Sequence, residues 1–150
     1  YLTGIGKSGA VASRFSVSLR SLGVRSAFVH GAEWAHGDLG GLKAGDVVIA
    51  MSHSGNTEEL VRLAPELRDR DVKLWAIVGR PNSPLQQAAD GGTIVAPATA
   101  ELLDLVPTRS IVAQEMIANA ILSLLAHQTE LDQHTFRKNH PGGAIGASNS

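Results

Sequence analysis

Short apolar stretches alternate along the chain with segments in which apolar side chains recur every three or four positions. Short stretches rich in β-branched residues are typical of buried strands, and the three-to-four spacing is typical of helices with one apolar face. The pattern therefore predicts five strands, at residues 1–3, 27–30, 46–51, 73–78 and 93–96.

Four segments between and after these strands predict helices, at residues 11–22, 60–67, 84–89 and 108–126. The first is ended by Gly23, and the second contains Pro65, where we expect a kink. The last is apolar on nearly every side, which predicts burial on several sides. In a chain of this size that burial implies a second subunit, so we expect a homo-oligomer, a dimer or a tetramer.

Strands that alternate with helices predict an α/β fold: a flavodoxin-like, three-layer αβα sandwich around a five-stranded parallel sheet. Sheets of this kind bind ligands at the carboxyl ends of their strands. No repeat or linker interrupts the pattern, so residues 1–150 are interpreted as a single domain. Because Tyr1 already lies in a strand, we expect the chain to be cut short at its N-terminus.

Composition excludes several classes of site and partner. The 150 residues include no cysteine, which rules out disulfides, iron–sulfur clusters and thiolate zinc sites. Thirteen basic and 14 acidic residues argue against binding nucleic acid or anionic membrane through bulk charge. The sequence contains no uncharged run of about 18 apolar residues, so it predicts no membrane span. Because no signal sequence is recognised either, we expect a cytoplasmic protein. The 16 glycines are unusual, and their positions guide the interpretation of the loops.

Three glycines after the first strand, Gly4, Gly6 and Gly9, follow the pattern of a dinucleotide-binding loop. That interpretation needs an acidic residue at the end of the second strand, where His30 stands instead. A phosphate-binding P-loop would need a glycine at position 1, which is tyrosine. The favoured interpretation is an anion site at a helix N-terminus with Lys7 and Ser8; the alternative is a tight turn with an exposed lysine.

The third strand is followed by a loop whose hydroxyl side chains can donate hydrogen bonds to phosphate oxygens: Ser52, Ser54 and Thr57, with Gly55 between them. The alternative is an ordinary helix N-cap formed by Asn56 or Thr57. Three hydroxyls within six residues exceed what capping requires, so the phosphate interpretation is favoured.

Histidines occur in two further loops. His30, Glu33 and His36 follow the second strand, where a metal site is an alternative to hydrogen bonding or acid–base chemistry. We favour the second interpretation, and no metal. His140 lies in a restrained Pro-Gly-Gly turn and, taken alone, is interpreted as structural.

Six motifs in order, GIGKSG, HGDLG, SHSGNTEE, GRPNSPL, PT-x-S and HPGGAIG, resemble the SIS (sugar isomerase) domain, and most of all its arabinose 5-phosphate isomerase group. The resemblance places phosphate-binding positions on Ser52, Ser54, Gly55 and Thr57. It places active-site positions on Lys7, His36, Glu59 and His140, and a second hydroxyl cluster on Thr108 and Ser110. The sequence departs from the group at His53, Asn56, Arg109 and Ile111, and Glu101 lies closer to Pro107 than the group's further glutamate does.

The resemblance implies isomerisation of ribulose 5-phosphate and arabinose 5-phosphate through an enediol(ate), without a cofactor. Glu59 would then act as the base, Lys7 would stabilise the enediolate, and His36 or His140 would open the ring or move the oxygen proton, in its own or a neighbouring subunit's site. Glu101 is a further candidate. Two alternatives stay open: a sensor domain that binds a phosphosugar without converting it, and an isomerase of another sugar phosphate.

Overall fold

Five parallel strands form one sheet in the order β2-β1-β3-β4-β5. The computed structural model describes residues 1–98, 100–129 and 131–147. The strands are β1 Leu2–Gly4, β2 Phe28–His30, β3 Val47–Ser52, β4 Lys73–Val78 and β5 Thr93–Val95. The predicted α/β class and parallel sheet are confirmed, and every predicted strand boundary lies within one residue of the observed one.

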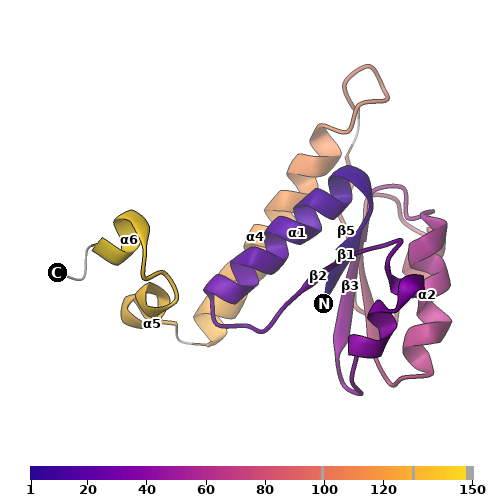
Figure 1. Ribbon diagram of the computed structural model, residues 1–150. Helices are drawn as coiled ribbons and strands as arrows, with labels where there is room; N and C mark the ends of the chain where they lie inside the picture. Colours follow the sequence, from indigo (N-terminus) through magenta and orange to yellow (C-terminus); the bar gives the residue numbers. More distant parts are fainter. Residues whose placement is uncertain (99, 130, 148–150) are drawn as a thin grey trace.

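Helices cover both faces of this sheet: α1 and α4 lie on one face and α2 on the other, whereas α5 and α6 lie apart (Figure 1). The helices are α1 Gly6–Ser21, α2 Glu58–Arg68, α3 Pro84–Ala88, α4 Arg109–Gln128, α5 Gln133–Lys138 and α6 Gly143–Ala147, with 3-10 turns η1 Trp34–His36 and η2 Asp38–Gly41. Gly23 ends α1 with a positive φ of 81°, as expected. The helix α2 continues through Pro65, and α5 and α6 are absent from the sequence prediction.

Each face of the sheet has its own apolar core. Leu60, Leu63 and Leu67 of α2 pack against the strands on one side. Phe15 and Leu19 of α1 pack on the other. Full burial of one such side chain contributes about 1.5–3 kcal/mol, so these two stripes fix the helix faces that the periodicity predicted.

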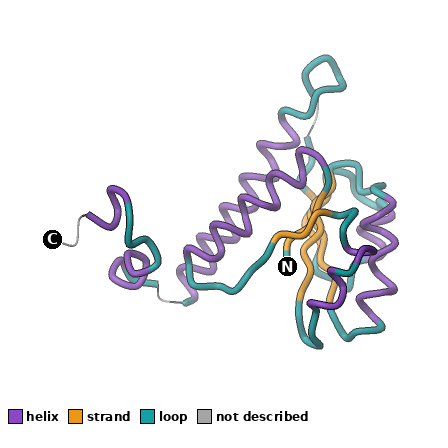
Figure 2. Tube along the Cα trace, in the orientation of Figure 1, coloured by secondary structure: helices purple, strands orange, loops and turns teal. Residues whose placement is uncertain are grey.

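The helices α1 and α4 run parallel to each other (Figure 2). Gln114 of α4 donates to Ser8 near the start of α1, and further along Arg14 donates to Asn119 at 2.8 Å and pairs with Glu115. Both helix N-termini therefore lie at the same end of the sheet. This is the end where the strands finish and where ligands are expected.

The outer side of α4 is apolar and exposed. Val112, Met116 and Leu124 have exposed fractions of 59, 67 and 63%, and they recur at helical spacing. Burial of α4 on several sides is thus not found within one chain, and a second subunit over this side stays a prediction. By length and composition α4 also suffices to cross a membrane, but here its polar residues bond to α1.

Candidate functional site

The loop after β3 folds around its own hydroxyl groups. Ser52 and Thr57 share a hydrogen bond of 2.8 Å, and the Gly55 amide donates to the Ser52 oxygen at 3.1 Å. Thr57 stands at the N-cap position of α2, yet its side chain makes no capping hydrogen bond. The predicted alternative of an ordinary Thr57 cap is therefore not what the structure shows, because the hydroxyl faces back into the loop.

Gly55 is required in this loop for two reasons. Its φ is +66°, a conformation that side chains disfavour, and a Cβ atom there would overlap the Ser83 side chain. The segment before α3 thus packs directly against the loop. Both features hold the loop in one shape, which is what a preorganised anion site needs.

The glycine loop after β1 serves packing as well as conformation. A Cβ on Gly4 would lie 2.9 Å from the Gly9 nitrogen, and a Cβ on Gly9 would lie 2.8 Å from the Gly4 oxygen. Gly6 has a φ of +58°. The three glycines therefore let α1 begin directly above β1, and among the described residues no side chain caps that N-terminus or adds an acid to its first turn. Its amides and the helix dipole favour an anion there.

A cavity of about 290 Å³ brings these segments together. It is lined by residues from three stretches of the sequence: Ile5, Lys7, Ser8, Ser52, His53, Ser54, Thr57, Pro107, Ser110 and Ile111. One lysine and five hydroxyl side chains therefore face one hollow at the carboxyl end of the sheet. Such a group of donors suits a phosphate. Six of the residues predicted for the site meet in this cavity. His53 also lines it, although in the sequence it stands out only as a departure from the group that the chain resembles.

Glu59 lies beside this cavity rather than in it. Its side chain lines a groove of about 440 Å³ between α2 and η1, together with Trp34, Ala35 and Arg62. Gly31, which also lines the groove, has Ile5 and Leu60 packed so closely that a Cβ would lie 2.8 Å from Ile5. Ile5 therefore stands between the groove and the hydroxyl cavity. His36 is exposed at the end of η1, next to Ala35.

Glu101 caps the N-terminus of α4. Its carboxylate accepts hydrogen bonds from the Thr108 hydroxyl and from the backbone amides of Thr108, Arg109 and Ser110, at 2.6–3.0 Å. The nearby Ser110 side chain and the hydrogen bonds from Thr108 lower the pKa of Glu101 to about 2. Thr108 is thus occupied with Glu101, whereas Ser110 faces the cavity. A carboxylate with this pKa has little affinity for a proton near neutral pH.

His140 lies at the opposite end of α1. Its ring stacks on Phe136 with a centroid separation of 4.2 Å, its Nδ1 lies 2.8 Å from the Phe136 oxygen, and neighbouring Asn139 donates to Ser21. Ser21 is the last residue of α1, a helix that spans about 24 Å at 1.5 Å per residue. One chain therefore does not bring its own His140 to its own cavity.

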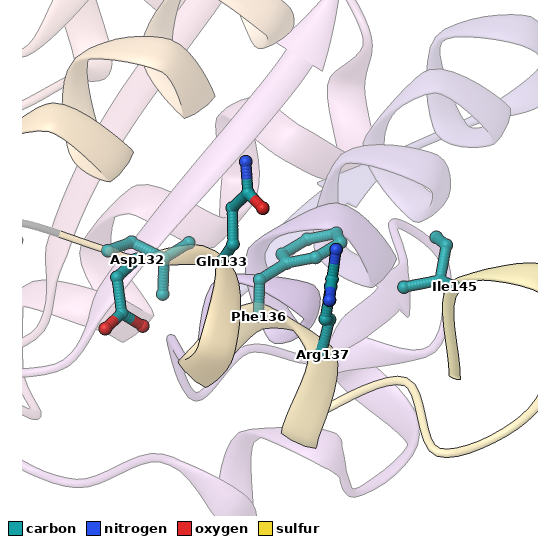
Figure 3. A pocket seen from close by; sticks show the side chains of 6 residues that line it. Asp132, Gln133, Phe136, Arg137 and Ile145 are labelled. Atoms are coloured by element: carbon teal, nitrogen blue, oxygen red, sulfur yellow. The ribbon is translucent and has the colours of Figure 1, made fainter. Parts of the chain in front are cut away.

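A further hollow of about 400 Å³ lies beside α5 and is lined by Asp132, Gln133, Phe136, Arg137, Ile145 and Leu131 (Figure 3). It contains none of the predicted site residues. Across the described ranges 1–98, 100–129 and 131–147, no group of three or more His, Cys, Asp or Glu side chains is arranged to hold a metal ion. That result includes His30, Glu33 and His36.

One buried residue beside the cavity was missed. Gln114 donates from Nε2 to the Ser8 hydroxyl at 3.1 Å and is 1% exposed. The signal was present, because Gln114 is a polar exception on a helix that is otherwise nearly all apolar. Its partner could not be read from the sequence, since 106 positions separate the two residues.

Comparisons with known proteins identify relatives of this chain. Residues 1–124 match the family model described as the SIS domain. The chain is 37% identical over 147 residues to the arabinose 5-phosphate isomerase GutQ of Salmonella typhi, and 40% identical over 144 residues to the arabinose 5-phosphate isomerase KdsD of that organism. The matches cover 97 and 95% of this chain and 46 and 44% of the relatives. The chain therefore spans somewhat less than half the length of these curated relatives.

Solved structures share the fold. A protein of E. coli CFT073 in complex with arabinose 5-phosphate superposes with a TM-score of 0.88 at 31% identity, over 93% of this chain and 75% of the other. The NanR protein of Vibrio vulnificus, complexed with ManNAc-6P, superposes with a TM-score of 0.77 over 93% of this chain and 54% of the other. At 18% identity this second likeness shows the fold alone.

Proposed function

The chain belongs to the SIS domain family, and from that membership we propose that it is an aldose–ketose isomerase that interconverts ribulose 5-phosphate and arabinose 5-phosphate. The observation that carries the proposal is the cavity where Lys7 and five hydroxyl side chains meet at the carboxyl end of the sheet. The relatives named as arabinose 5-phosphate isomerases, and the similar structure that holds arabinose 5-phosphate, support this choice of sugar.

The phosphate group belongs in the cavity. Ser8, Ser54, Ser110 and one member of the hydrogen-bonded pair Ser52 and Thr57 supply hydroxyl donors, and the N-terminus of α1 adds backbone amides and its dipole. Gly55 lets this loop pack directly against Ser83, which holds the loop in shape for these contacts. Fixing the phosphate places the sugar's reacting carbons in a limited region beside it, which lowers the entropy cost of reaction.

The reaction moves a proton between C1 and C2. A base removes a C1 proton of the ketose, an enediolate forms, and a proton is delivered to C2 while the hydroxyl proton on O1 moves to O2. We assign the base to Glu59, whose groove adjoins the cavity across Ile5, so the sugar must extend from the cavity toward that groove. Lys7, in the cavity, offers positive charge to the developing oxyanion.

Glu101 takes no acid–base step in this proposal. Four donors already occupy its carboxylate, and its pKa of about 2 makes it a poor proton acceptor. Its role is to hold the start of α4, and with it Ser110, at the cavity.

The positions of the histidines support a homo-oligomer. His36 is exposed near the groove, and His140 lies at the far end of α1. We propose that His140 serves the site of a neighbouring subunit, docked through the exposed apolar side of α4 at Val112, Met116 and Leu124. An imidazole side chain can act as a general acid or base, which suits ring opening or transfer of the oxygen proton.

A sensor domain is the alternative, because binding needs only the cavity and Glu59 lies outside it. Incubation with ribulose 5-phosphate and product analysis by NMR separates the two. The isomerase yields arabinose 5-phosphate, and Glu59→Gln or His140→Ala abolishes turnover while the sugar phosphate still binds. A ligand that raises the melting temperature but is never converted supports the sensor instead.

A further inference from the structure

Gln114 is a buried amide with part of its hydrogen-bonding capacity unused. It lies on α4 at 1% exposure, and its Nε2 donates to the Ser8 hydroxyl on α1 at 3.1 Å. Its other end, Oε1, is buried and has no hydrogen-bond partner within the described part of the chain. A buried polar atom without a partner lowers the stability of the fold. An apolar residue would avoid that cost, so the amide needs an explanation beyond packing.

The hydrogen bond from Gln114 determines whether the Ser8 hydroxyl is free to donate or to accept a further hydrogen bond. Because the Ser8 oxygen accepts from the amide, its own O–H remains available to donate. Ser8 also lines the hydroxyl cavity, and no described residue accepts a hydrogen bond from it. The amide therefore supports a hydroxyl that can give its hydrogen to an anion in the cavity.

Ser110 extends the same polar cluster. It lies one helical turn before Gln114 on α4 and is 0% exposed. Its hydroxyl lies near the Glu101 carboxylate but makes no hydrogen bond of regular geometry with any described residue. Ser110 lines the cavity together with Ser8. Ser110 thus borders the space where we place the phosphate, and a ligand oxygen or an ordered water there can complete its hydrogen bonding. Gln114 reaches the same space through its hydrogen bond to Ser8.

We propose that Gln114 is a positioning residue for the phosphosugar, which acts through Ser8 by holding its oxygen as an acceptor so that its hydroxyl donates to the phosphate. This inference rests on the proposed function for its ligand. It does not require that the chain perform the isomerisation, because the role concerns binding.

If Gln114 positions Ser8, its replacement should change the affinity for the sugar phosphate without lowering the stability of the fold. Gln114→Met keeps the length of the side chain, removes the unpartnered Oε1, and leaves Ser8 without its donor. The melting temperature should therefore stay equal or rise, while binding of the sugar phosphate weakens. A residue that served packing alone would show the opposite: lower stability with unchanged affinity.

The test measures the dissociation constant for arabinose 5-phosphate by calorimetry in four proteins: wild type, Gln114→Met, Ser8→Ala and the double variant. We expect Gln114→Met to weaken binding about tenfold, equal to about 1.4 kcal/mol. Because Gln114 acts through Ser8, the double variant should bind within about twofold of Ser8→Ala alone. In turnover, KM should rise by the same factor and kcat should stay within about twofold.

Gln128→Met is the matched control, since Gln128 is exposed at the last turn of α4, about 21 Å along the helix from Gln114. It should bind like the wild type. Unchanged affinity in Gln114→Met, or effects of Gln114→Met and Ser8→Ala that multiply, would overturn the inference while leaving the proposed function standing. If the wild type binds arabinose 5-phosphate but does not convert it, the isomerase proposal is rejected. The affinity of Gln114→Met then still tests the positioning role of Gln114. A wild type that does not bind arabinose 5-phosphate would reject both.

Discussion

Glu59 and Glu101 carry the same carboxylate group, but its hydrogen-bond partners and surroundings differ in the folded chain. Glu101 accepts four hydrogen bonds at the start of α4, and its pKa falls to about 2. Glu59 lines an open groove on the first turn of α2. Local contacts, rather than residue type, therefore decide which glutamate is available as a base.

Glu101→Gln should lower the melting temperature at pH 7. The pKa of Glu101 is depressed from 4.5 to about 2 in the folded chain, so its stabilisation is complete above about pH 4.5 and is lost as the pH falls toward 2. The difference in melting temperature between wild type and variant should shrink across that window, as measured by circular dichroism. Asp104→Asn, an exposed change in the same loop, is the control. Equal melting temperatures for Glu101→Gln and the wild type at pH 7 would contradict the capping role.

At the level of elements, the strands and the first four helices could be predicted, because buried strands and amphipathic helices leave clear apolar patterns. The short α5 and α6 could not. The first depends on a cap in which Asp132 accepts from the Thr135 amide, and on the contact of Asn139 with Ser21 at the end of α1. These contacts are polar and one is long-range, so hydrophobic periodicity carries no trace of them.

The close approach of α1 to β1 places Lys7 and Ser8 at the cavity. Gly9→Ala should push the two elements apart, since the new Cβ would lie 2.8 Å from the Gly4 oxygen. We expect a loss of about 1–3 kcal/mol in the free energy of unfolding from the overpacking, and binding of arabinose 5-phosphate should weaken clearly. Urea denaturation and calorimetry measure both. Gly40→Ala, with open space around the new Cβ, should leave binding unchanged; an equal loss of binding in the two variants would contradict this role of the glycine contact.

For the whole molecule, the sequence predicts which residues belong to one site, but it does not predict whether a single chain brings all of them together. Lys7 and the hydroxyl residues were predicted to share one edge of the sheet because the carboxyl ends of parallel strands meet there. His140 follows the sheet in sequence, and no periodicity indicates where α5 comes to rest. The distance of His140 from the cavity is therefore known only from the folded chain.

If neighbouring subunits share sites, mixtures of inactive variants should regain activity. Glu59→Gln and His140→Ala each lose turnover alone, yet a mixed oligomer contains some sites with an intact Glu59 from one chain and an intact His140 from the other. Subunit exchange followed by a rate assay with ribulose 5-phosphate should therefore recover part of the wild-type rate. Light scattering should report an oligomer. A mixture as inactive as its components would contradict a shared site.

A phosphosugar held in the hydroxyl cavity and isomerised through an enediolate gives up a proton from C1 to a base, which can exchange that proton with solvent. The reaction of ribulose 5-phosphate in D₂O, followed by NMR, detects that exchange. We predict arabinose 5-phosphate that carries deuterium at C2, because the proton removed by the base exchanges with solvent before it returns. Ribulose 5-phosphate recovered unchanged and free of deuterium, from protein that remains folded, would contradict the proposed isomerisation.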